Sequence, residues 1–132
     1  MAFYNIKIEG VNDMNTIVAI STASGNAGVG IIRLSGEDCF EVIKRIFNIK
    51  EVDIKPNTIK YGHIRDRDEI IDEVLVSFFK APKSFTRENM CEINSHGGTI
   101  VMKRILELCI KNGARLAEPR RIYKKSIPKW KN

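Results

Sequence analysis

The chain has 132 residues, of which 43% are hydrophobic, and a net charge of +6. This length suits one domain whose core buries roughly two thirds of the unfolded surface. Six of the 22 basic residues lie after Glu118, and the rest of the chain balances 16 basic against 16 acidic residues. The positive charge therefore belongs to a short tail, which argues against a nucleic-acid-binding surface on the domain itself.

The three cysteines, Cys39, Cys91 and Cys109, lie among apolar residues and show no C-x-x-C spacing. We expect them to be reduced core residues of a cytoplasmic protein. No apolar run approaches the ~20 residues that cross a membrane. The first residues also lack the pattern of a signal peptide. We therefore expect no contact with a membrane.

The first half of the chain predicts strands followed by a helix. Residues 4–9 alternate weakly between apolar and polar, whereas residues 15–22 and 29–34 have the continuous apolar character of buried strands. Ser35 is a suitable N-cap for a helix, with acidic residues following it in the first turn. The face of this helix that we expect to be apolar comprises Phe40, Ile43, Ile46 and Phe47.

The second half predicts three more strands, a long helix and a short last strand. Residues 59–64 and 70–79 read as an antiparallel pair, and residues 90–94 as another strand. A helix over residues 99–112 precedes Gly113, a typical C-terminal stop, and residues 115–117 read as an edge strand. Its predicted apolar stripe comprises Val101, Ile105, Leu108 and Cys109. This order of elements predicts an α+β fold: a mixed sheet with two to three packed helices.

A glycine cluster, Gly25, Gly28 and Gly30, lies between the first two strong strands. A phosphate loop needs a helix after it and a Gly-Lys-Ser/Thr sequence, and a dinucleotide-binding turn also leads into a helix. Neither pattern is present. Two interpretations remain: a tight hairpin that needs positive φ, or a backbone that approaches a ligand closely.

Two charged residues, Arg33 and Glu92, each interrupt an apolar strand. Arg33 either reaches solvent from an edge strand or needs an acidic side chain or an anionic ligand. Glu92 either forms an internal salt bridge, with Arg33 as a candidate partner, or binds a ligand together with it. If both face one pocket, they suit a ligand that has a carboxylate and a fused ring with a donor edge.

His96 is one of two histidines and precedes Gly97-Gly98. It has no second metal ligand at helical spacing and belongs to no Ser-His-Asp arrangement. We therefore expect it to fix the turn or to line a pocket, and we predict no metal site and no catalytic residue.

Six ordered segments resemble the N-terminal domain of a tRNA-modification GTPase family, MnmE (also called TrmE). The resemblance covers residues 14–119, and its segments are residues 14–20, 28–36, 71–76, 81–86, 92–98 and 113–119. It implies a folate-binding α+β domain that also forms a homodimer. It implies further that a folate of the 5-formyl-tetrahydrofolate type contacts Arg33 and Glu92.

The resemblance also implies a role for the complete family enzyme. That enzyme works with an FAD-containing protein of the MnmG type to place a carboxymethylaminomethyl-type group on the wobble uridine of certain tRNAs. It hydrolyses GTP, with Mg and K, in a separate domain. The present chain contains no P-loop sequence, so we expect it to have no GTPase activity alone.

Both ends depart from the family pattern. Met14 matches the usual first residue, so residues 1–13 are expected to be an N-terminal extension. Residues 120–132 form a basic tail in place of Gly-Glu-Phe-Thr-Lys-Arg-Ala-Phe-Leu-Asn-Gly-Lys. A one-base shift of a permitted codon set recovers that sequence. We therefore hypothesise an out-of-frame tail on a truncated chain, which sequencing of the gene would test.

These departures affect the expected folate site. The family's lysine in Leu-Asn-Gly-Lys is missing in frame, so weaker folate binding is expected. Arg87 stands where the family has glycine, which changes the expected loop geometry. Two alternatives to a folate-binding domain stay open: a free-standing dimerisation or interaction module without folate, and a non-functional product of a disrupted gene.

Overall fold

The computed structural model describes residues 15–21, 29–49, 54–81, 84 and 88–117. Along the chain the elements are β1 (Thr16–Ile20), β2 (Gly30–Gly36), α1 (Cys39–Ile46), β3 (Thr58–Asp66), β4 (Glu69–Phe79), β5 (Met90–Ser95), α2 (Thr99–Lys111) and β6 (Arg115–Leu116). This order confirms the predicted succession of strands and helices. The predictions for residues 1–13, the glycines at 25 and 28, Arg87 and the tail lie outside the described residues.

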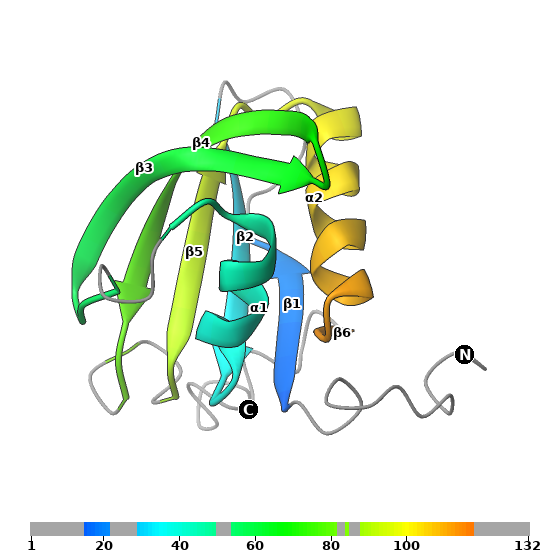
Figure 1. Cartoon of the computed structure of the whole chain (residues 1–132). Coiled ribbons are helices and arrows are strands. Elements are labelled where there is room, and N and C mark those ends of the chain that lie inside the picture. Colours follow the sequence, from blue (N-terminus) through cyan, green and yellow to red (C-terminus); the bar gives the residue numbers. More distant parts are fainter. Residues whose placement is uncertain (1–14, 22–28, 50–53, 82–83, 85–87, 118–132) are drawn as a thin grey trace.

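The strands form one mixed sheet in the order β3-β4-β5-β2-β1-β6. Strand β1 pairs with β6 in parallel, and the other pairs of neighbouring strands are antiparallel. Helices α1 and α2 lie side by side against the sheet, and the β3–β4 hairpin curves towards α2 (Figure 1). The fold is therefore α+β, as predicted.

The core lies between the sheet and the two helices. Alternate residues of the strands, such as Ile32, Leu34 and Ile93, are fully buried in the same cluster as Ile43 of α1 and Ile105 of α2. Because side chains alternate across a strand, the residues between them point to the other face of the sheet. Arg33 and Glu92, the charged residues that interrupt apolar strands, lie on that other face.

The three cysteines are free and buried, as expected. Burial raises the pKa of Cys109 to about 12. Burial also raises the pKa of Cys91 well above its usual range, and the hydrogen bond with Cys39 adds to the effect. The Sγ atoms of Cys39 and Cys91 are 3.6 Å apart. These thiols behave as small apolar core groups.

The predicted N-cap at Ser35 is wrong, because β2 continues through this residue to Gly36. Ser35 is buried, and its hydroxyl donates a hydrogen bond to Glu88 Oε1 at 3.2 Å. Helix α1 begins only at Cys39, after Asp38, and no side chain caps it. This later start places Val42 in the core, while Phe40 is only partly buried. Likewise, Met102 of α2 is buried, whereas Val101, which was predicted to belong to the apolar stripe, is only partly buried.

Gly30 has a structural role in the close packing of β2 against α2. It is absent from the glycines with positive φ, which are Gly36, Gly97 and Gly113. A Cβ at Gly30 would lie 2.2 Å from Met102 Sδ and 3.0 Å from Gly97 Cα. Glycine is therefore needed here because β2 begins in close contact with the start of α2.

Candidate functional site

Arg33 and Glu92 face each other directly on the neighbouring strands β2 and β5. Arg33 donates hydrogen bonds to Glu92 Oε2 from Nε at 2.9 Å and from Nη2 at 2.6 Å. The two side chains are 21% and 19% exposed. The internal salt bridge, which the sequence left as one of two possibilities, is thus confirmed.

This ion pair lies on the sheet face opposite the helices. Arg33 stands between the buried Ile32 and Leu34, and Glu92 stands between the buried Cys91 and Ile93. Both hydrogen bonds converge on Oε2, and Glu92 Oε1 accepts none from the described part of the chain. The carboxylate is therefore held in a fixed orientation with one oxygen available.

The strand registers arrange the side chains of this face in rows across the sheet. One row runs from Ile59 through Ser77 and Glu92 to Arg33. The next row runs from Tyr61 through Leu75 and Asn94 to Ile31. The apolar members on β3 and β4 are exposed: Ile59, Tyr61 and Leu75. We call these three residues the apolar patch.

Asn94 lies two residues beyond Glu92 on the same face, since the alternation of β5 is regular. Its Oδ1 is buried and has no hydrogen-bond partner among the described residues. A buried acceptor without a donor costs about 1–3 kcal/mol. A polar side chain with an unmet hydrogen bond thus lies beside the ion pair.

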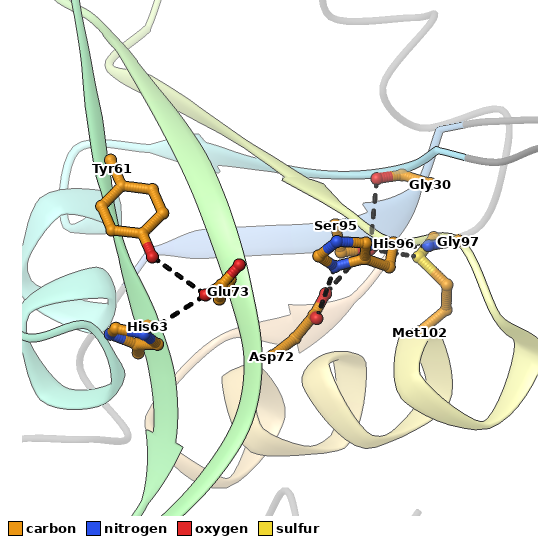
Figure 2. A network of polar contacts seen from close by, with 9 residues as sticks. All are labelled: Gly30, Tyr61, His63, Asp72, Glu73, Ser95, His96, Gly97 and Met102. Atoms are coloured by element: carbon orange, nitrogen blue, oxygen red, sulfur yellow. Dashed lines mark hydrogen bonds and ion pairs between the residues drawn. The ribbon is translucent and has the colours of Figure 1, made fainter.

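His96 follows the last residue of β5 and is held by one carboxylate, as Figure 2 shows. Its backbone N–H donates to Asp72 Oδ2 at 2.9 Å, and its ring Nδ1 lies 2.7 Å from Asp72 Oδ1. The His96 side chain is 66% exposed, whereas that of Asp72 is 11% exposed. His96 therefore helps to fix the turn before α2, as the sequence suggested.

The neighbouring Ser95 lies beside the start of α2, close to Met102 (Figure 2). Its hydroxyl contacts Gly30 O at 3.3 Å and Met102 Sδ at 3.0 Å. Gly97, with φ 77°, takes a conformation that favours glycine. These contacts fix the His96-Gly97-Gly98 turn in relation to β2 and α2.

Sequence reasoning missed a second polar cluster on β3 and β4, also drawn in Figure 2. The Tyr61 hydroxyl donates to Glu73 Oε2 at 3.0 Å, and His63 Nε2 lies 4.0 Å from the same oxygen. The hydrogen bond to Glu73 raises the pKa of Tyr61 above its usual 10.0. The period-two alternation of the two predicted strands was the signal that could have grouped these residues.

Within the described ranges, no group of three or more His, Cys, Asp or Glu residues is placed to hold a metal ion. Neither helix of that part of the chain has the length and apolar character needed to cross a membrane. The groups that remain for a ligand are the Arg33–Glu92 pair, Asn94, His96 and the apolar patch.

Comparison with known proteins places the chain in one family. The family model described as "GTP-binding protein TrmE N-terminus" matches residues 16–121. A protein of Thermoanaerobacter pseudethanolicus named tRNA modification GTPase MnmE is 52% identical over 119 residues, which is 86% of this chain and 26% of that protein. Proteins of the same name from Acetivibrio thermocellus and Streptococcus thermophilus are 53% identical over 117 residues and 48% identical over 116 residues. Their alignments cover 86% and 87% of this chain and 26% and 25% of those proteins.

The chain thus spans about a quarter of the length of these curated relatives. The family model covers nearly all the residues of this chain that the structure describes. The match includes Arg33, Glu92, Asp72 and His96. The chain therefore belongs to the TrmE N-terminus family.

Proposed function

We propose that this domain binds a folate of the 5-formyl-tetrahydrofolate type and forms a homodimer, as the N-terminal part of a tRNA-modification GTPase. The observation that carries the proposal is the Arg33–Glu92 pair, oriented on the sheet face that the helices leave uncovered. The relatives' printed name supports the tRNA-modification role.

The chemistry of the pair suits the donor edge of a pterin ring. An ionised carboxylate is a pure acceptor, and Glu92 Oε1 accepts no hydrogen bond from the described residues. Arg33 keeps this carboxylate in place from the neighbouring strand β2. The neighbouring apolar patch supplies a surface for an aromatic ring.

Calorimetric titration of the full chain with 5-formyl-tetrahydrofolate tests folate binding. Glu92→Gln keeps the shape of the side chain but removes its charge, and we expect the affinity to fall by about tenfold or more. Glu107→Gln, an exposed acid on α2 on the other side of the sheet, is the matched control and should leave the affinity unchanged. Equal affinities for Glu92→Gln and the unaltered chain would contradict the assignment.

The apolar patch supports the homodimer, because a contiguous apolar surface on a sheet face favours burial against a partner. Sedimentation of Leu75→Glu should show a weaker dimer, since the substitution places a charge within the patch. Ile100→Glu is the control, because Ile100 is exposed on α2, away from this face. A dimer that forms without any folate binding would favour the rival function, an interaction module.

In a polypeptide of the relatives' full length, we propose that this domain serves wobble-uridine modification with an MnmG-type FAD protein, in the cytoplasm. GTP hydrolysis, with Mg and K, belongs to another domain of that polypeptide. Mass analysis of nucleosides from cells that carry Glu92→Gln in the full-length protein tests this role. We expect a loss of the carboxymethylaminomethyl-type modification, and unchanged tRNA modification would refute it.

A further inference from the structure

We infer that the outer edge of β3 binds residues 4–9 of a second copy of this chain as an additional antiparallel strand. These residues lie outside the described part of the chain, and their sequence alternates between apolar and polar. The inference rests on the proposed homodimer, but it uses the backbone of β3, whereas that proposal uses the side chains of the apolar patch. It depends on the free edge of β3, on the side chains along it and on the reach of the chain.

Strand β3 lies at one edge of the sheet and has free backbone groups there (Figure 1). The His63 N–H donates to Asn48 Oδ1 at 3.0 Å, so it points away from β4. Backbone groups alternate in an antiparallel pair, and the register of residues 58–64 is regular, so the N–H and C=O groups of Ile59 and Tyr61 also point outward. No residue in the described ranges forms a backbone hydrogen bond with them from outside β3. Such an edge can pair with another strand.

The free stretch of this edge is short and has a lysine at its centre. The Phe47–Ile64 bridge closes the edge beyond it, so Ile59 and Tyr61 supply the free groups, with Lys60 between them. Two β3 strands that paired through all of these groups would place Lys60 of one copy opposite Lys60 of the other. Like charges directly opposite each other destabilise a strand pair. The edge therefore fits a different strand, with apolar residues at alternate positions and no cation opposite Lys60.

Residues 4–9 have this alternation, and their apolar members are Tyr4, Ile6 and Ile8. Residues directly opposite each other in paired strands project to the same face of the sheet. The apolar members would therefore lie beside Ile59 and Tyr61, which are 64% and 62% exposed, and would extend the apolar patch. Burial of these exposed apolar side chains against one another favours the pairing.

Charge selects the register of this pairing. If Ile6 stood opposite Tyr61, Lys7 would stand opposite Lys60, and the two cations would repel each other. A shift of two residues places Ile6 opposite Ile59 and brings a neutral asparagine opposite the lysine of β3. In this register Ile6 and Ile59 would exchange two backbone hydrogen bonds.

The strand order assigns the segment to a second copy. β3 is first in the order and β1 is fifth, so a strand outside β3 lies about 24 Å from β1, five spacings of ~4.8 Å. The seven Cα–Cα steps from residue 9 to Thr16, the first residue of β1, span at most about 25 Å when fully extended. Within one chain this linker would have no slack with which to pass around the end of a twisted sheet. A second copy has no such restriction.

The test is amide hydrogen exchange of the full chain, followed by NMR at concentrations at which the chain is dimeric. Pairing should slow exchange of the Ile59 and Tyr61 amides by about tenfold or more, and dilution to the monomer should abolish the effect. Ile6→Pro removes the N–H that pairs with Ile59 and should abolish it as well. Asn12→Pro, outside the pairing segment, is the matched control and should leave exchange slow.

A mixing experiment identifies the source of the strand. Isotope-labelled Ile6→Pro chain keeps an intact β3 but lacks a segment that can pair, and the unlabelled, unaltered chain is added in excess. A segment from the second copy should restore slow exchange at Ile59 and Tyr61 of the labelled chain. A segment of the same chain cannot do so, and a lack of restoration would therefore overturn the inference.

The outcomes separate this inference from the proposed homodimer. If the unaltered chain dimerises while Ile59 and Tyr61 exchange as fast as exposed amides, the inference is overturned and the homodimer stands. If slow exchange persists in Ile6→Pro, another strand covers the edge of β3, and the inference is also overturned. If the chain is monomeric at every concentration, both proposals fail.

Discussion

Removal of the Arg33–Glu92 pair should destabilise the domain by a measurable and cooperative amount. We consider Arg33→Met, Glu92→Gln and the double variant. Exposed ion pairs contribute at most about 1 kcal/mol, and breaking a fully buried pair costs about 3–5 kcal/mol. With side chains about one fifth exposed and two hydrogen bonds to one oxygen, this pair lies between those limits. We expect each single substitution to lower the free energy of unfolding by about 2 kcal/mol.

The assay is urea unfolding of all four proteins, with the interaction energy taken from the double-mutant cycle. We expect an interaction energy of about 1–2 kcal/mol, because the double variant leaves no charge without its partner. The matched control is Arg104–Glu69, which also has two hydrogen bonds, at 3.1 and 3.0 Å, but lies exposed. It should show no resolvable interaction energy.

The same interaction energy in the two cycles would contradict this prediction. In that case burial on the sheet face would not determine the strength of the pair. A loss of folate affinity in Glu92→Gln could then not be attributed to the partial burial of this ion pair, because an exposed ion pair would behave in the same way. An unchanged urea dependence, the m-value, across the four proteins is the check that substitution has not altered the unfolded state.

Three further predictions address the core. The pKa of Cys109 is about 12 in the folded chain, above its usual 9.0. The neutral Cys109 thiol therefore stabilises the fold below pH 9, and this contribution is lost as the pH rises towards 12. Urea unfolding should show this loss of stability, and Cys109→Ala should make the loss smaller. Gly30→Ala should cost about 1–3 kcal/mol because its Cβ would overlap Met102, and Met102→Ala should recover part of that cost in the same assay. Phe78→Ala should cost about 3–5 kcal/mol and lower the melting temperature, whereas Ile59→Ala, at an exposed position, should change it little; equal effects would contradict the assigned core.

Periodicity in the sequence was enough to predict the secondary structure elements and the α+β class, because buried strands and amphipathic helices have distinct apolar patterns. It failed at Ser35, where a good N-cap residue also continues β2. Local capping preference was overridden there by pairing with β1 and β5. Local rules could not foresee this, because both partners are distant in sequence.

The candidate site was predicted in part. Arg33 and Glu92 were noticed because each charge interrupts an apolar strand, but their pairing needs the β2–β5 register. The partner of His96 could not be identified at all, since Asp72 reaches it only where β4 runs beside the end of β5. Tyr61 and Glu73 were missed although the alternation of the two predicted strands places them on one face. Residue type thus indicated the candidates, and strand register decided their partners.

The sheet order has a consequence for the time at which the site can form. Strands β2 and β5 are neighbours, although Arg33 and Glu92 are separated by 59 positions. On a ribosome, the β1–β2 hairpin and α1 emerge well before β5. Arg33 therefore cannot pair with Glu92 until β5 has been synthesised, whereas the β3–β4 hairpin can form earlier from local contacts. The ligand site then appears together with the completed sheet, and ligand binding would report that synthesis has passed β5.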